Sequence, residues 1–336
     1  MNKKRIALAL LGACALASCT TSEPATKENL EKLQMAFSAT ADKPEAGYTV
    51  SGDAEFSSNV NGKAMVDAKI KGLEAGFSYR VASEGKEQEA YGNFKYNSLN
   101  LEIANEDTGE LDTKIVSKKS SASAYFKGNT AYVDCSKINF EKLIVEGKEA
   151  NLGATKLAFS GLDFGNIITS GGGEVGARIA NYVPAVSSTS EEDENYVNPI
   201  IKQIISFNKS GGTTEAVITI NKGTIKSILA STMIPTDGSQ TQSPDYASMV
   251  KEANQQVSEM VDAYITDLKF TCSVKFNDSG IIGASLKTSG KIDLSALSSA
   301  PLSQIVSWNI TLNVKNNGPK IPTDFDTAGY TFSNAN

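Results

Sequence analysis

The sequence contains no histidine, and this absence excludes more than any other feature of its composition. Without an imidazole there is no Ser-His-Asp triad, no Cys-His dyad and no histidine-ligated zinc, copper or haem. Aromatic residues make up only 7% of the 336 residues, and Trp308 is the single tryptophan. The formal net charge of −6 argues against a nucleic acid partner, because phosphate binding requires a basic surface.

Motifs for catalysis and cofactor binding are also missing. There is no CxxC pair, so redox catalysis is not expected. The glycine run 171–173 lacks the Lys-Ser/Thr of a P-loop, and the acidic run 191–194 lacks the spacing of a calcium loop. Ser-Lys chemistry stays open because Ser117-Lys118-Lys119 occurs, although no motif singles it out. We therefore expect no enzyme activity, no cofactor and no metal site.

Residues 1–18 have the parts of a signal peptide. Lys3, Lys4 and Arg5 form a positive start, and residues 6–17 are an uncharged stretch shorter than the ~20 residues of a membrane-spanning helix. The stretch ends in Leu16-Ala17-Ser18-Cys19, which resembles the lipobox of bacterial lipoproteins. That resemblance implies cleavage before Cys19 and attachment of acyl chains such as palmitate to it.

The resemblance also implies a location in the cell envelope. Residues 19–25 would be a lipid-anchored polar tether, and the membrane would be a partner through the anchor. A residue other than Asp after the lipidated cysteine, here Thr20, is typical of outer-membrane lipoproteins in bacteria with two membranes. In a host with one membrane, the expected place is the outer face of the cytoplasmic membrane.

Cys14 would leave with the signal peptide and Cys19 would carry the lipid, so Cys135 and Cys272 are the two cysteines left free to pair. Each lies in a stretch of alternating apolar residues, so each should point to the apolar side of a strand. In an oxidising compartment they either form a disulfide across a long loop or remain two buried free thiols.

Alternating apolar and polar residues predict strands over residues 47–135. Four hairpin signals separate them: Asn61-Gly62, Gly85, Asp107-Thr108-Gly109 and Gly128-Asn129. The apolar segments are read as 48–56, 66–70, 77–81, 99–103, 111–116, 122–126 and 130–135. One apolar and one polar side indicate an antiparallel meander with one side covered.

Helix patterns begin the body and interrupt the strands. The spacing predicts helices over Thr26–Thr40, from Asn198 through Phe207 to Gly211-Gly212, after Asn221, and from Pro244 to about Thr266. Further strands follow at 270–276, 281–292 and 306–314, with an extended end carrying Phe325, Tyr330 and Phe332. We expect one α+β domain over 26–336 with a helical insert at about 174–266.

Because only the helices have wide apolar stripes, they should cover the apolar side of the sheet. A large antiparallel sheet twists and curls, so we expect a half-barrel with amphipathic helices on its concave face. Such a layout leaves an apolar space between the layers, where a small ligand can bind.

This layout resembles the LolA/LolB and LppX/LprG-type lipoprotein carriers. The resemblance rests on the lipobox, the first helix, the hairpin at Ala124–Val133, the strand-to-helix passage at Thr219–Leu229 and the ending at Leu312–Pro322. It implies a half-barrel with a helical lid that takes up acyl chains or a lipidated protein.

The sequence thus predicts a lipid-anchored envelope protein that binds or carries a lipid or acyl-chain ligand. The apolar surplus on the short helices, together with Trp308, suggests the residues of the cavity: Ile204, Ile225, Ile228, Leu229, Met233, Met260 and Trp308. The alternative is a structural or adhesive surface lipoprotein without a small ligand, in which these residues are ordinary core. The oligomeric state stays open.

Overall fold

A computed structural model describes residues 22–41, 43–83, 87–105, 107–151, 155–161, 199–233, 246–295 and 303–334. The predicted signal peptide, Cys19 and the first part of the predicted insert lie outside these residues. The helices are α2 (Lys27–Ala41), α4 (Pro199–Ile204), α5 (Lys222–Met233) and α6 (Tyr246–Tyr264). The strands are β1 (Glu23–Pro24), β2 (Glu45–Val60), β3 (Lys63–Arg80), β4 (Glu89–Ala104), β5 (Leu111–Lys127), β6 (Thr130–Lys137), β7 (Phe140–Val145), β8 (Lys148–Glu149), β9 (Lys156–Ser160), β10 (Ile205–Ser210), β11 (Thr213–Asn221), β12 (Ile265–Asn277), β13 (Gly280–Asp293), β14 (Gln304–Lys315) and β15 (Thr331–Asn334).

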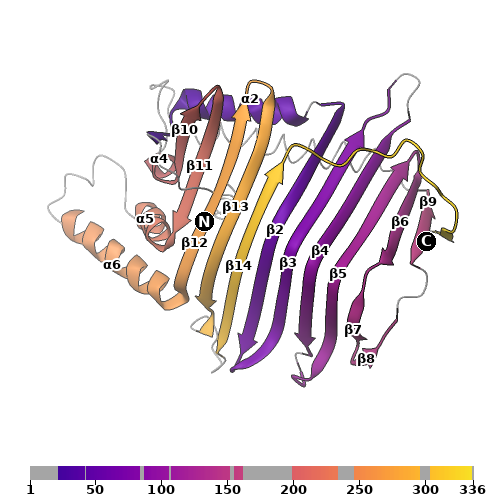
Figure 1. The fold of residues 1–336 in the computed structure, drawn as a ribbon. Helices are drawn as coiled ribbons and strands as arrows, with labels where there is room; N and C mark the ends of the chain where they lie inside the picture. The colour runs from indigo at the N-terminus through magenta and orange to yellow at the C-terminus, as the bar shows by residue number, and fades with distance from the viewer. Residues whose placement is uncertain are drawn as a thin grey trace.

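These strands form one open sheet of 15 strands (Figure 1). Its main order is β1-β10-β11-β12-β13-β14-β2-β3-β4-β5-β6-β9-β15, with β7 on β5 and β8 on β7. The pairs are antiparallel except that β15 runs parallel to β9. The predicted meander over 47–135 is confirmed, because β2 to β6 pair in sequence order without a described helix between them.

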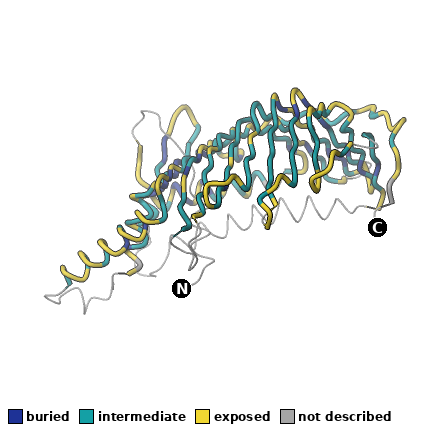
Figure 2. Tube along the Cα trace, turned by 90° about the horizontal axis from the view of Figure 1, so that it is seen from below, coloured by how far each residue is buried: buried dark blue, intermediate teal, exposed yellow. Residues whose placement is uncertain are grey.

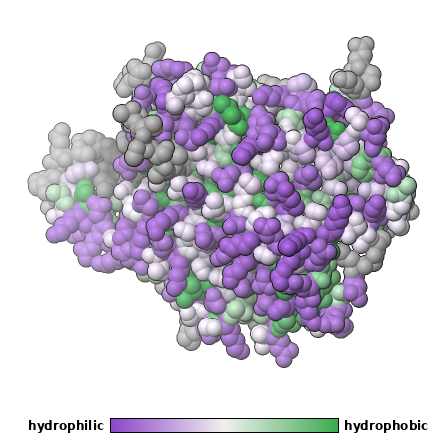
Figure 3. Space-filling view, viewed as in Figure 1, coloured by the Kyte–Doolittle hydropathy of each residue, from purple (hydrophilic) through white to green (hydrophobic). Residues whose placement is uncertain are grey.

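The strand register separates the sheet into two chemically different faces. Trp308, Phe56, Ala68, Leu101 and Ile115 stand opposite one another across five neighbouring strands, β14 and β2–β5. We call their side the apolar face. On β14 and β2–β4, the residues next to these point to the opposite side of the sheet, which we call the polar face. They are Asn309, Glu55, Lys69 and Asn100. Hydrophilic side chains dominate the molecular surface in Figure 3, as expected for a view of the polar face.

A line of irregular residues crosses the long strands at one height. On β3 the apolar face passes from Ile70 to Leu73, a step of three residues instead of two, because Gly72 is an extra residue with φ of 61°. On β5 the step is from Ser117 to Ser120, and Lys119 has φ of 46°. Such bulges keep the faces intact while shifting the alternation by one residue. For this reason 66–70 and 77–81, expected as separate strands, are the single strand β3, and 111–116 and 122–126 are both β5.

The helix predictions are confirmed at three places and wrong at one. Thr26 caps α2 by accepting the Asn29 amide at 3.2 Å, and Asn221 caps α5 by accepting the Thr224 amide at 3.0 Å. The third is α6, which lies within the predicted 244–266. The helix expected up to Gly211-Gly212 ends at Ile204, where β10 begins. Both glycines have positive φ (56° and 78°) and make the two-residue turn of the β10–β11 hairpin, which a helix pattern does not reveal.

The described helices pack at one end of the sheet. In α2, Leu30 and Leu33 contact Phe207 of β10, and in α4, Ile204 contacts Ile218 and Ile220 of β11. Figure 2 shows buried residues at this end and again towards the opposite edge of the sheet, whereas β2 and β3 are mostly of intermediate burial. The described helices therefore pack on the apolar face over β10–β13. Further along, that face is unevenly buried: Phe94 is 37% exposed, whereas Tyr96 and Ala122 on β4 and β5 are 5% and 8% exposed.

The C-terminal segment crosses the polar face from β14 to the opposite edge (Figure 1). Thr49 donates a hydrogen bond to the carbonyl of Asn317 at 2.9 Å, and the ring of Phe325 stacks on Tyr125 with centroids 4.4 Å apart. The segment ends as β15, beside β9. Phe325, Tyr330 and Phe332, expected in an extended end, all surround Tyr132.

Candidate functional site

The structure brings part of the predicted cavity set together, as packed core. Ile204, Ile225, Ile228 and Trp308 belong to one cluster, whose buried members include Ile218, Ile220 and Leu268. Leu229 packs in the neighbouring cluster between α5 and α6. These contacts are those of a filled interior, and a ligand would have to displace side chains to enter it.

The two predicted methionines lie outside this interior. Met233 is 50% exposed and Met260 is 43% exposed. Two depressions on the described residues lie away from the predicted cavity residues. One lies on the polar face between β3 and β6, and the other lies beside Met35 on the outer side of α2.

An apolar face on the central strands was predicted, but the described helices pack on β10–β13 instead. Beyond Trp308, four neighbouring strands carry apolar side chains on that face, of which Phe56 is exposed and the others are half-buried: Ala54, Phe56, Val66, Ala68, Ile70, Leu99, Leu101, Ile103 and Ile115. Phe56, Phe77 and Phe94 are 40%, 38% and 37% exposed. The signal was present in the sequence, because β2–β5 contain far more alternating apolar residues than the few short helices can cover.

Trp308 marks the border between the covered and the open parts of this face. Its indole nitrogen donates to the Thr288 hydroxyl at 2.9 Å, which satisfies the one polar atom of the ring. The ring lies over Gly290, where an added Cβ would come within 2.4 Å of it. On one side Trp308 contacts the cluster under the helices, and on the other it stands opposite the exposed Phe56.

Two Ser-Lys arrangements among the described residues make other contacts. Ser117 is fully buried and shares hydrogen bonds with Tyr96 and Ser120, while Lys118 forms an ion pair with Glu141. Lys226 donates to the Ser258 hydroxyl at 2.8 Å and also contacts Asp262 at 2.7 Å. These contacts join α5 to α6.

Cys135 and Cys272 are free thiols, so the disulfide alternative is wrong. They lie on β6 and β12, with six strands between them in the sheet. At a strand spacing of about 4.8 Å, that separation far exceeds the reach of a disulfide. Burial raises the pKa of the Cys272 thiol to about 12, and burial also raises that of Cys135, which leaves both thiols unreactive.

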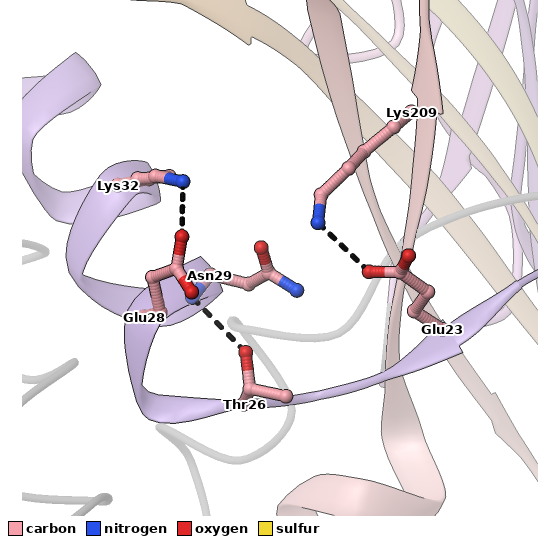
Figure 4. Close-up of polar contacts among 6 residues, drawn as sticks. All are labelled: Glu23, Thr26, Glu28, Asn29, Lys32 and Lys209. Carbon is pink, nitrogen blue, oxygen red and sulfur yellow. Dashed lines mark hydrogen bonds and ion pairs between the residues drawn. The ribbon is translucent and has the colours of Figure 1, made fainter.

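The expected tether ends earlier than predicted, because residues 23–25 belong to the body. Glu23 and Pro24 pair with β10, and Ala25 is 1% exposed. Figure 4 shows the Glu23 carboxylate facing Lys209 of β10, at 2.9 Å. A hydrogen bond from Lys209 and its charge lower the pKa of Glu23. The folded body therefore begins four residues after Cys19.

Comparison with known proteins returned no match, neither to a family nor to a curated protein. Among the described helices, none is both long and apolar enough to cross a membrane. The described residues also contain no group of three or more Cys, Asp or Glu side chains that could hold a metal ion.

Proposed function

We propose that the protein is a lipid-anchored envelope protein that binds a lipid through its acyl chains. The observation that carries this proposal is the open apolar face on β14 and β2–β5, formed by the rows of apolar residues described above. The binding surface proposed here differs from the one expected from sequence. It is the open face beside the helices rather than a space beneath them.

The chemistry of this face suits an acyl chain better than a polar ligand. In the row from Trp308 to Ile115 the one polar side-chain atom is the indole nitrogen, which already donates to Thr288. The row therefore offers contact area without a free side-chain donor or acceptor. Covering apolar surface contributes roughly 25 cal/mol per Å², and soluble proteins rarely leave large contiguous apolar patches open. Apolar ligands of extended shape gain most from such a strip.

The anchor and the half-barrel are parts of the same proposal. Attachment of lipid to Cys19 would hold the β1 corner within about 14 Å of the lipidated residue, because an extended chain advances at most ~3.6 Å per residue. A curled half-barrel with helices on its concave face, as in the LolA-type carriers, would turn the open apolar face inward. The helices packed on β10–β13 support this arrangement, since they lie on the apolar face.

The direct test is native mass spectrometry of the chain from Thr20 onward, purified from a bacterial host, beside an organic extract of the same sample. A stoichiometric lipid mass that is lost on extraction is the expected result, and its identity gives the ligand class. A chain that remains empty after incubation with membrane lipids would contradict the proposal.

Two substitutions on adjacent residues of β4 locate the binding surface. Leu101 lies on the apolar face and Asn100 on the polar face of the same strand. Leu101→Lys places a charge on the proposed surface and should abolish lipid retention, whereas Asn100→Lys should leave it unchanged. Equal retention by both variants would place the lipid elsewhere.

The second candidate function is a structural or adhesive lipoprotein, in which the same face binds a protein. Aromatic side chains are enriched in protein interfaces, and this face exposes three of them: Phe56, Phe77 and Phe94. An empty lipid spectrum together with concentration-dependent association of the purified chain, abolished by Leu101→Lys, would favour this alternative.

A further inference from the structure

The polar face contains a depression of ≈ 240 Å³ between β3 and β6. We propose that this depression is a binding site for one ring of a neutral saccharide. The site is on the opposite side of the sheet from the proposed lipid surface and does not depend on it.

The strand register explains why the surface is hollow here. Ser121 and Ser123 are short side chains on β5, while the facing positions of β4 carry Lys95 and Asn93 and those of β6 carry Lys137 and Asp134. A bulge on β6 sets three residue steps between Asp134 and Lys137 against two on β5, which spreads these side chains apart. Long side chains thus surround a floor of two hydroxyl groups.

The charges that line the depression balance one another. Glu74 and Lys95 form an ion pair at 2.9 Å, and Asp134 and Lys137 are the other two charged side chains of the lining. The lining thus has two acidic and two basic side chains. A surface without net charge selects neither an anion nor a cation, so the ligand that fits best is neutral.

The remaining groups suit a ligand with many hydroxyls. Asn93 offers an amide donor and acceptor, Ser121 and Ser123 offer hydroxyls that donate or accept, and Tyr91 offers a ring and a phenol. Hydroxyl groups of a saccharide donate and accept in the same way, and the apolar edge of a sugar ring packs on an aromatic ring. The volume is below the ~300 Å³ of sites that enclose a drug-sized ligand, so the depression takes one ring of a longer glycan.

Gly76 lies next to Asn93, one of the residues that line the depression. An added Cβ at Gly76 would lie 2.8 Å from the Asn93 side-chain oxygen and 2.8 Å from Pro319 of the C-terminal segment. The glycine therefore lets the crossing segment approach the sheet while Asn93 stays beside it. This close packing fixes the amide that the proposal assigns to sugar binding.

The test is saturation-transfer NMR of the chain from Thr20 onward with maltotriose and with tri-N-acetylchitotriose, and with inorganic phosphate as the charged probe. We expect transfer to the ring protons of at least one saccharide, weakened about tenfold by Asn93→Ala, which removes an exposed hydrogen-bonding group. Ser121→Tyr, which fills the hollow, should weaken it at least as much.

The matched control is Asn309→Ala, which removes an exposed amide of the same face outside the depression and should bind as the unchanged chain does. Binding of neither saccharide, binding of phosphate alone, or saccharide binding that survives both Asn93→Ala and Ser121→Tyr would overturn the proposal. Because none of these variants alters the apolar face, the result is independent of lipid retention.

Discussion

The two ends of the apolar face carry similar side chains but differ in how deeply those side chains are buried. Over β10–β13, Phe207, Ile220 and Leu268 are almost completely buried under helices. Over β2–β5, Phe56 and its neighbours remain half-buried or exposed, although their alternation is equally regular. The apolar pattern of a strand therefore indicates which face is apolar, but the number and length of the helices decide how much of that face is covered.

The difference has an energetic consequence. A side chain between two layers contributes transfer free energy and close packing, whereas a side chain on one layer contributes only the contacts with its neighbours in the sheet. The covered end should thus supply most of the stability, and the central strands should tolerate substitution, which is the property that a binding surface requires.

The largest expected effect comes from removing matched aromatic rings at the two ends. Phe207→Ala should lower the free energy of unfolding by about 3–5 kcal/mol, because the ring is fully buried. Phe56→Ala should cost about 1 kcal/mol, since the ring is 40% exposed. Urea unfolding of both variants measures the two losses in the free energy of unfolding. Equal losses would show that Phe56 is packed as completely as Phe207.

The covered end was also the part that sequence patterns predicted less well. The predicted helix after Asn198 exists as α4 but was predicted too long. Ile200, Ile201, Ile204 and Ile205 fit a helical stripe, while Ile205 and Phe207 equally fit a strand that faces α2. Short apolar runs do not distinguish the two structures. The sequence feature that indicates a strand here is the Gly211-Gly212 pair, which forms the β10–β11 hairpin turn.

The central region was correctly predicted to consist of antiparallel strands, but β3 and β5 were each read as two separate strands. The alternation breaks at Gly72 and at Lys119, and each break looks like the end of a strand when one chain is read alone. The bulges lie side by side on neighbouring strands, a relation that is visible only once the register is known. For the same reason, sequence reasoning could not foresee the depression formed by side chains of β3–β6.

The border between the two regions gives the second prediction. Gly290→Ala should cost about 1–3 kcal/mol, because the new methyl group would overlap the Trp308 ring that closes the covered core. Gly92→Ala is the control, since its added Cβ meets nothing closer than 3.6 Å and its effect should be within about 0.5 kcal/mol of zero. Tryptophan fluorescence during unfolding should shift for the first variant alone.

Glu89 tests the far end of the central strands. Burial raises its pKa, but a 2.8 Å hydrogen bond from Tyr125 and the charges of Arg80 and Lys127 outweigh burial and lower the pKa below 4.5. Because the folded-state pKa is depressed, the stabilisation is present above the unfolded value and is lost as pH falls through the folded value. The thermal midpoint should therefore fall more steeply below about pH 4.5 in the unchanged chain than in Glu89→Gln. Parallel curves would contradict this role.

The smallest effect is expected at the outer helices of the covered end, where Asp262 contacts Lys222 and Lys226 at 2.7 Å each. Hydrogen bonds from Lys222 and then Lys226 lower the pKa of Asp262 to about 2, so this stabilisation is lost only as pH falls through that value. Since the carboxylate is exposed to solvent, Asp262→Asn should lower the thermal midpoint slightly at low salt and not at about 1 M salt. Glu259→Gln, which removes a charge bonded to Gln255 on the same helix, should show no such salt dependence. A salt-independent loss in Asp262→Asn would mean that α5 and α6 are joined by packing of the Ala230, Val257 and Val261 cluster rather than by charge.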